Sequence, residues 1–171
     1  MKTLIGLALL VAVSAWAQNP DRPDAQWQSL QFLTGKWTGG GGGQPGSGEG
    51  AFSFEAELNH RILVRHSFNL IKSGPEAGSR HDDLMIVYVE APGQLPRAIY
   101  FDSEGHVIRY GVSTPKPNIA VFESDGSQLG PRYRLSYALE GKNLNGKFEI
   151  APPGKPEYKT YLTWTTVKDE R

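Results

Sequence analysis

The segment that decides the fold is Leu30-Gln-Phe-Leu-Thr-Gly-Lys-Trp-Thr-Gly39, in which a short apolar turn leads into Gly-x-Trp-x-Gly. A run of glycines follows it, and nearly all of the chain beyond has the pattern of β-strands. Ahead of it, Asp24 can cap a short helix from Ala25 to about Phe32, because an aspartate side chain accepts hydrogen bonds from the free amides of a helix start. The segment therefore predicts the entrance to a small antiparallel barrel.

The chain after this segment predicts about ten strands joined by short connections. Apolar and polar residues alternate with a period of two, which is typical of a half-buried strand. Asn59-His60 suits a two-residue hairpin turn because Asn tolerates positive φ. The expected strands begin at Lys36 and then cover residues 50–58, 61–70, 83–90, 97–102, 106–113, 118–123, 132–139, 143–150 and 158–167.

Connections this short make neighbouring strands antiparallel. A meander of ten strands has two edges unless it closes, and closure removes both. A β-sandwich is the alternative, but it usually has a long connection between its two sheets. We therefore predict an all-β fold: an antiparallel up-and-down barrel of about ten strands with one short N-terminal helix.

The first residues predict a cleaved signal peptide. Lys2 provides the positive start, residues 3–14 are apolar or small, and Ala15-Trp-Ala17 is an A-x-A cleavage site. The apolar run is too short to span a membrane, which takes about 20 residues. The expected organisation, for a periplasmic or secreted protein, is a signal peptide at 1–17, a linker at 18–24 and a single barrel domain at 25–171.

The composition of the chain excludes several classes of binding partner and of chemistry. Without the 17 residues of the signal peptide, the chain of 171 is 154 long; it has 18 basic and 18 acidic residues, and Lys2 leaves with the signal. The resulting net charge of −1 gives no attraction to nucleic acid or anionic lipid. The chain has no cysteine, which excludes thiol catalysis, iron–sulfur clusters and cysteine zinc sites. The oligomeric state stays open.

The motif Phe32-Leu33-x-Gly35-x-Trp37-x-Gly39 resembles calycin-like (lipocalin- or nitrobindin-like) barrels. The chain is closest in style to secreted bacterial proteins of the DUF1579-like group, in segments 81–85, 97–110 and 148–156. The resemblance implies a calycin-like barrel with Trp37 as a plug at one end. Nitrobindin-like barrels bind haem through a histidine late in the chain. Here the four histidines lie at or before position 106, so no cofactor is expected.

On several strands, the more apolar of the two alternating sets of residues also contains side chains with a polar end, such as tyrosine and histidine. This pattern predicts an interior cavity. A barrel of this size can hold a small ligand, in a cavity that is mostly apolar with a few polar groups. Alternatively, the tyrosines straddle the surface with their hydroxyls in water. The candidate ligand-binding residues are His66, Phe68, Tyr88, Phe101, Tyr110, Tyr133 and Tyr137.

Four arginines fall on the opposite phase of their strands, one per strand: Arg65, Arg97, Arg109 and Arg134. We expect them on the outer face, paired with Glu55, Glu57 and Glu149, because this phase buries more apolar area. The reverse phase would place arginines inside the barrel, where they could hold a carboxylate.

Three further motifs have ordinary structural interpretations. Residues 39–50 include eight glycines and predict a flexible hairpin tip, or a mobile lid. His81-Asp82-Asp83 lies in an expected loop, and no His-x-His or His-Glu-x-x-His spacing appears, so no metal is predicted. Asp102 and His106 can pair across a hairpin turn, as a base oriented by a carboxylate or as plain turn chemistry.

The sequence thus favours an exported, non-enzymatic barrel that binds a small, largely apolar molecule, with no catalytic residues assigned. A protein-interaction or structural module of the cell envelope is the alternative, which an exposed apolar patch on the outer wall would support. Haem binding, or an enzyme at the barrel mouth near Asp102 and His106, is disfavoured.

Overall fold

The computed structural model describes residues 25–91, 93–126 and 130–170. The predicted signal peptide at 1–17 and linker at 18–24 lie outside the described residues. Within the described ranges, no helix has both the length and the apolar character that crossing a membrane requires.

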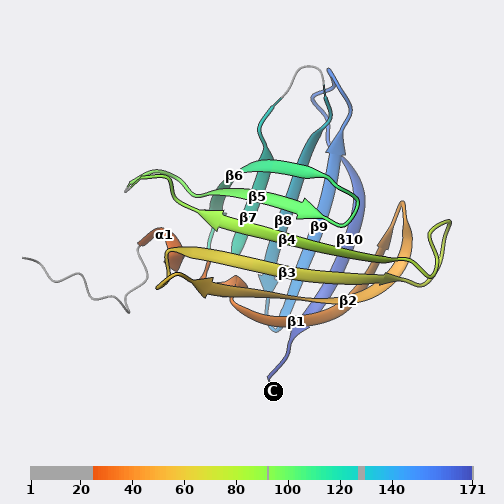
Figure 1. Ribbon diagram of the computed structural model, residues 1–171, viewed down its shortest axis with the longest axis horizontal. Helices are drawn as coiled ribbons and strands as arrows, with labels where there is room; N and C mark the ends of the chain where they lie inside the picture. The colour runs from red at the N-terminus through yellow and green to blue at the C-terminus, as the bar shows by residue number, and fades with distance from the viewer. Residues whose placement is uncertain (1–24, 92, 127–129, 171) are drawn as a thin grey trace, which may run out of the picture.

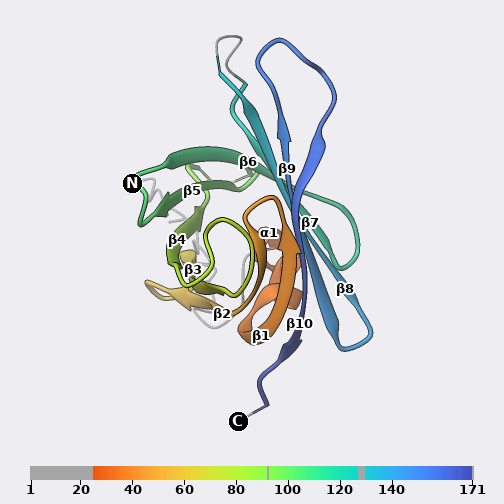
Figure 2. The same cartoon turned by 90° about the vertical axis from the view of Figure 1, so that its right-hand side faces the viewer.

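Ten antiparallel strands close into one barrel, which confirms the predicted fold class. Each strand pairs with its neighbours in sequence, and β1 pairs with β10 to complete the wall (Figures 1 and 2). In Figure 1, β3–β5 cross the view in front while β8–β10 run steeply behind them. The strands are β1 (Gly35–Gly43), β2 (Gly46–Glu57), β3 (Ile62–Ile71), β4 (Arg80–Tyr88), β5 (Arg97–Asp102), β6 (Val107–Lys116), β7 (Ile119–Ser124), β8 (Arg132–Glu140), β9 (Asn143–Ala151) and β10 (Lys159–Lys168).

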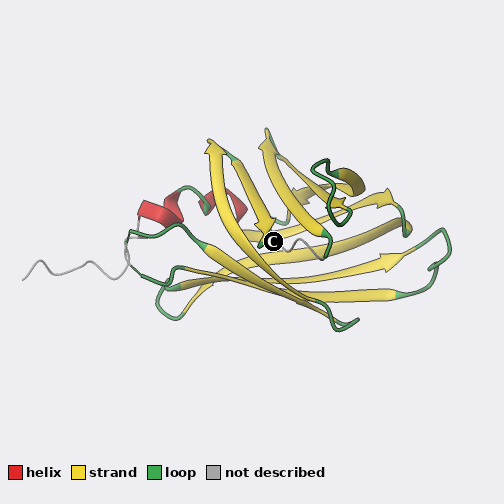
Figure 3. Cartoon of the chain, turned by 90° about the horizontal axis from the view of Figure 1, so that it is seen from above, coloured by secondary structure: helices red, strands yellow, loops and turns green. Residues whose placement is uncertain are grey.

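The helical segment is shorter than predicted. It consists of α1 (Ala25–Gln28) and a separate 3₁₀ turn, η1 (Gln31–Leu33), both at one end of the barrel (Figure 3). The backbone amides of Leu30 and Leu33 bond to carbonyls three residues back, at 3.0 Å. This tighter winding buries both leucines almost completely. Packing at the barrel end therefore overrides the continuous helix from 25 to 32.

Trp37 lies under this helical segment. Its side chain is 2% exposed, and its indole Nε1 donates a hydrogen bond to the carbonyl of Leu33 at 2.8 Å. Leu30 and Leu33 belong to the same buried cluster. Trp37 is therefore part of the packed core at this end of the barrel, and its role as a plug stays a prediction.

The glycine-rich run is part of the wall. Strands β1 and β2 pair without interruption to Gly43 and Gly46, which leaves only two residues at the tip of the hairpin. A Cβ atom at Gly41 would lie 2.0 Å from the carbonyl oxygen of Thr163 and 2.6 Å from the Cβ of Trp164. Glycine is required here because β1 coils closely against β10. The run forms the hairpin between the first two strands, as predicted, but residues 39–50 are almost wholly paired strand, so the prediction of a flexible tip or a lid over them is wrong.

One of the four predicted outer arginines lies inside the barrel. Arg65 on β3 pairs with Phe54 on β2 and with Met85 on β4, both of which belong to the core. Cross-strand partners share a face of the sheet, so Arg65 faces inward and is 6% exposed. Arg134, by contrast, lies outside and bonds Glu149 at 2.7 Å, as predicted.

The Arg134–Glu149 pair predicts a dependence of stability on pH. Glu149 is 5% exposed; burial opposes its charge, but Arg134 and Lys147 outweigh burial and lower its pKa. A lowered pKa stabilises the fold above the unfolded-state value of about 4.3, and this contribution is lost as the pH falls through the folded-state pKa. Urea unfolding should therefore show a smaller loss of stability between about pH 5 and about pH 3 in Glu149→Gln than in the wild type. Parallel profiles for the two proteins would contradict this.

Candidate functional site

A cavity of about 410 Å³ occupies the half of the barrel away from α1. It reaches from the β1–β2 hairpin and the β5–β6 turn inward to the level of Arg65 and Tyr110. The next layer inward, which includes Val87 and Val112, is packed core. The apolar part of the wall includes Phe52, Ile108, Tyr133, Leu135, Phe148 and Trp164.

An aromatic cluster closes the inner end of this cavity. The Tyr137 ring lies edge-on to Phe54 and Phe122, with ring centroids 5.7 and 6.1 Å apart. Phe52 contacts the same tyrosine at 5.8 Å and also lines the cavity. Edge-to-face contacts of this kind add to the stabilisation that burial provides, so the floor of the cavity is a firmly packed layer.

A buried ion pair lies on the cavity wall at this level. Arg65 donates to Asp83 on β4 and, through the other terminal nitrogen, to Ser67 at 3.1 Å. The Arg65 and Asp83 side chains are 7% and 4% exposed. Burial opposes the charge on Arg65, but Asp83 and the three neighbouring tyrosines, Tyr137, Tyr100 and Tyr110, together outweigh burial and raise the pKa of the guanidinium. The guanidinium of Arg65 therefore keeps its charge inside the barrel.

Two buried polar atoms near this pair have no hydrogen-bond partner among the described residues: Arg65 Nε and the Tyr137 hydroxyl. Burial raises the pKa of Tyr137 to about 12, while the nearby charge of Arg65 acts in the opposite direction. Buried donors without partners are rare in folded proteins, because losing hydration without compensation is unfavourable. The inner end of the cavity therefore offers unused polar contacts.

The outer part of the cavity has a second polar network. The Tyr100 hydroxyl lies 3.0 Å from His81 Nε2 and donates to Asp102 Oδ2 at 3.3 Å. His81 Nδ1 is 2.8 Å from Glu104 Oε1, and His106 Nδ1 is 2.9 Å from Asp102 Oδ2. All five side chains line the cavity. The network is therefore continuous around this side of the mouth.

The carboxylate of Asp102 is held in a fixed orientation. Burial opposes its charge, but hydrogen bonds from the backbone amides of Glu104 and His106 and from the His106 ring outweigh burial and lower its pKa. Burial also raises the pKa of Tyr100, so its hydroxyl keeps its proton and can donate. The Asp102–His106 pair that the sequence predicted is present.

The structure separates the seven predicted ligand-binding residues. Tyr110 and Tyr133 line the cavity, and Tyr137 is buried just beneath it. The other four lie on the outward phase of their strands: His66, Phe68, Tyr88 and Phe101. For these four, the predicted orientation toward the interior is wrong.

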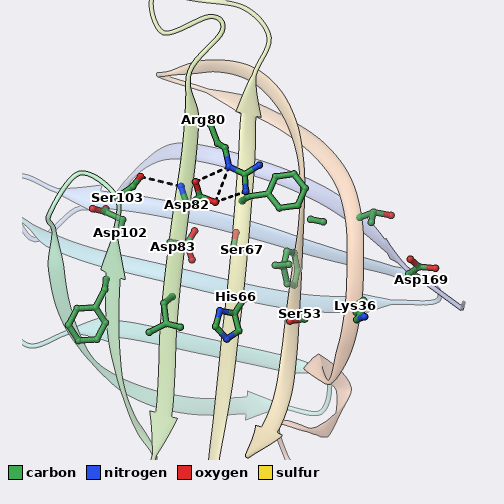
Figure 4. Close-up of a pocket in the computed structure, with 16 residues that line it drawn as sticks. Lys36, Ser53, His66, Ser67, Arg80, Asp82, Asp83, Asp102, Ser103 and Asp169 are labelled. Carbon is green, nitrogen blue, oxygen red and sulfur yellow. Dashed lines mark hydrogen bonds and ion pairs between the residues drawn. The ribbon is translucent and has the colours of Figure 1, made fainter.

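His66, Phe68 and Phe101 line a groove on the outside of the barrel (Figure 4). The guanidinium of Arg80 lies 4.5 Å from the centre of the Phe68 ring and bonds Asp82. Phe101 is 39% exposed. The groove is shallow and open to solvent on the outer face of β2–β5, so these side chains are separated from the interior cavity by the sheet itself.

The interior roles of Asp83, His81 and Glu104 are not predicted from the sequence, and an inward Arg65 is only the alternative phase there. The sequence predicts a loop at His81, but β4 begins at Arg80 and directs His81 into the cavity. The signal that could have found it is strand pairing: Asp83 on β4 lies opposite Asp102 on β5, which brings His81 beside the β5–β6 turn.

No protein-family model and no curated protein sequence matches this chain. The fold and cavity therefore define the class of protein on their own. The chain is a closed ten-stranded antiparallel barrel, compatible with a calycin-like fold, with a cavity inside it.

Proposed function

We propose that this protein is an exported, non-enzymatic barrel that binds a small, largely apolar molecule in its interior cavity. One observation carries the proposal: a cavity of about 410 Å³ inside the barrel has aromatic and aliphatic walls and a few buried polar groups. Ligand sites typically have volumes of about 300–1,000 Å³ and this mixture of surfaces. The signal-peptide pattern at residues 1–17 is the support for export.

The polar groups indicate how such a molecule would lie. An apolar body would contact Tyr133, Phe148 and Trp164 in the wall. An oxygen atom at its inner end would accept a hydrogen bond from Arg65 Nε, which has no partner within the described part of the chain. Because Asp83 already balances the charge of Arg65, a neutral carbonyl or hydroxyl group suits this position as well as a carboxylate does.

Filling the cavity tests the proposal. The probe is 1-anilinonaphthalene-8-sulfonate, a small aromatic sulfonate whose fluorescence rises in apolar surroundings. We expect saturable binding to the wild type and an affinity at least about tenfold weaker in Leu162→Trp, since about 1.4 kcal/mol of lost contact corresponds to tenfold. Leu162 lines the cavity, and a larger side chain there would occupy the space of the probe.

The matched control is Val107→Trp, because Val107 is 53% exposed on the outer wall. It should bind the probe as the wild type does. Near-ultraviolet circular dichroism of both variants checks that the barrel remains folded, since a loosened core would itself bind the probe. Equal probe affinity in folded Leu162→Trp and wild type, or no saturable binding to the wild type, would overturn the proposal.

A further inference from the structure

We propose that His81, Asp102 and Glu104, with His106 beside them, bind a divalent transition-metal ion of the zinc type at the mouth of the cavity. One potential ligand atom from each of His81, Asp102 and Glu104 lies within 4.8 Å of the others. The inference goes beyond the proposed function, because it concerns the metal alone and requires no organic ligand.

The spacing of the donor atoms fits such an ion. Zinc binds histidine nitrogen and carboxylate oxygen at about 2.0–2.2 Å, so neighbouring ligands of a tetrahedral site lie about 3.3–3.6 Å apart. His81 Nδ1 is 2.8 Å from Glu104 Oε1, and one donor atom from each of His81, Asp102 and Glu104 lies within 4.8 Å of the others. Side-chain rotations would bring these donors to the tetrahedral separation. His106 Nδ1 is 2.9 Å from Asp102 Oδ2 and 3.8 Å from Glu104 Oε2, so His106 would join the site only by leaving its hydrogen bond with Asp102.

The two ring nitrogens of His81 have different partners. His81 Nε2 lies 3.0 Å from the Tyr100 hydroxyl, and His81 Nδ1 lies 2.8 Å from Glu104 Oε1. Imidazole has two tautomers. The one that donates from Nε2 to Tyr100 directs the lone pair of Nδ1 toward Glu104, and a metal ion between these two groups would select it.

The same contacts would hold the ligands in place around a metal. A metal-binding histidine usually donates its other ring N–H to an oxygen, which fixes the orientation of the ring. Tyr100 has this position relative to His81. Asp102 is fixed by the backbone amides of Glu104 and His106. The four side chains come from β4, the end of β5 and the tight β5–β6 turn, which are joined by strand pairing.

The set of donors selects the class of metal. Imidazole nitrogens combined with carboxylates suit zinc and related transition metals, whereas calcium and magnesium prefer sites made only of oxygen. The four side chains also line the cavity, so a coordination position left free by the protein would face its interior. Such an open position is typical of zinc sites that take a water molecule or a small ligand.

Isothermal titration calorimetry of the untagged full chain, stripped with a chelator, tests the proposal with Zn²⁺ alone. We expect one Zn²⁺ per chain, with an affinity at least about a hundredfold higher than for Ca²⁺ or Mg²⁺. His81→Asn and Glu104→Gln should each weaken Zn²⁺ binding at least about tenfold. Glu104 is 57% exposed, so its substitution leaves the core intact.

The matched controls are His60→Asn and His66→Asn, which alter exposed histidines outside the donor cluster. Both should bind Zn²⁺ as the wild type does. Zinc-edge X-ray absorption should show nitrogen and oxygen ligands with at least one imidazole. Absence of 1:1 binding, unchanged binding in His81→Asn and Glu104→Gln, or equal losses in the two controls would each overturn the inference.

Discussion

Replacement of Arg65 by methionine is expected to destabilise the barrel by about 3–5 kcal/mol, which is the typical effect of removing one partner of a buried ion pair. Asp83, 4% exposed, would be left as an uncompensated charge inside the barrel. Methionine matches arginine as far as Nε, so the change removes the guanidinium and keeps the packing of the aliphatic stem. Urea unfolding, monitored by tryptophan fluorescence, measures the difference.

A double variant separates charge from packing. Arg65→Met/Asp83→Leu removes both charges, and buried pairs replaced by apolar groups are often neutral or stabilising. The double variant should therefore be more stable than Arg65→Met alone. The matched control is Arg80→Met, which removes an exposed arginine from the Arg80–Asp82 pair on the outer face, and it should change stability little. An equal effect of Arg65→Met and Arg80→Met would contradict the inward orientation of Arg65.

Truncation of Trp37 to alanine should cost about 3–5 kcal/mol, the usual range for removing a large aromatic side chain from a core. Trp37 is 2% exposed and packs in the same cluster as Leu30 and Leu33. Its loss would leave a void between the barrel and the 3₁₀ turn that covers it. The change in the free energy of unfolding, from urea titrations, is the measurement.

Trp37→Phe isolates the hydrogen bond within this effect. Phenylalanine keeps most of the packing but cannot donate to the carbonyl of Leu33, which would be left buried without its 2.8 Å bond. The expected loss is about 1–3 kcal/mol, smaller than for alanine. If Trp37→Ala cost less than about 1 kcal/mol, the side chain would not be closing the barrel in solution.

The strands of this barrel could be predicted from the sequence because each one alternates apolar and polar residues over a run bounded by turn residues. The predicted strand at 97–102 has the bounds of β5, and others differ by a few residues at their ends. Alternation also gave the correct inward face of β2, where Phe52 and Phe54 are buried. The alternation of apolar residues and the residue types found in turns depend only on neighbouring residues, so a single sequence is enough to predict strands from them.

The inward face of β3 could not be taken from its own composition, because Ile62, Leu63 and Val64 are apolar on both phases. The neighbouring turn decides which face is inward. It covers residues 58–61, two more than the predicted two-residue turn, and is centred on the same pair, Asn59 and His60. Phe54 and Arg65 are each five residues from the Asn59-His60 turn, so a hairpin there pairs them, and the structure has this pairing. Partners on adjacent strands share a face. An inward Phe54 therefore requires an inward Arg65, and His66 faces out.

The same logic applies to the β5–β6 hairpin. Its turn is centred on Glu104, which pairs Tyr110 with Ala98 and places Phe101 opposite Val107 on the outside. When each strand is considered alone, both Phe101 and Tyr110 are expected inside the barrel. The outer polar network could not be found in this way, because His81 and Glu104 are 23 residues apart and meet only through strand pairing.

The pairing of β1 with β10 has a consequence for how the chain closes on itself. Nine of the ten pairings join strands that follow one another in sequence. The tenth pairing is a seam in which Gly39 lies opposite Thr166, so it joins two strands from opposite ends of the chain. Closing so long a loop costs more chain entropy than any of the hairpins does. Strand β1 is made largely of glycine, so it has few side chains whose contacts could offset this entropy cost. The seam between β1 and β10 therefore relies on backbone hydrogen bonds and on close contact between the two main chains.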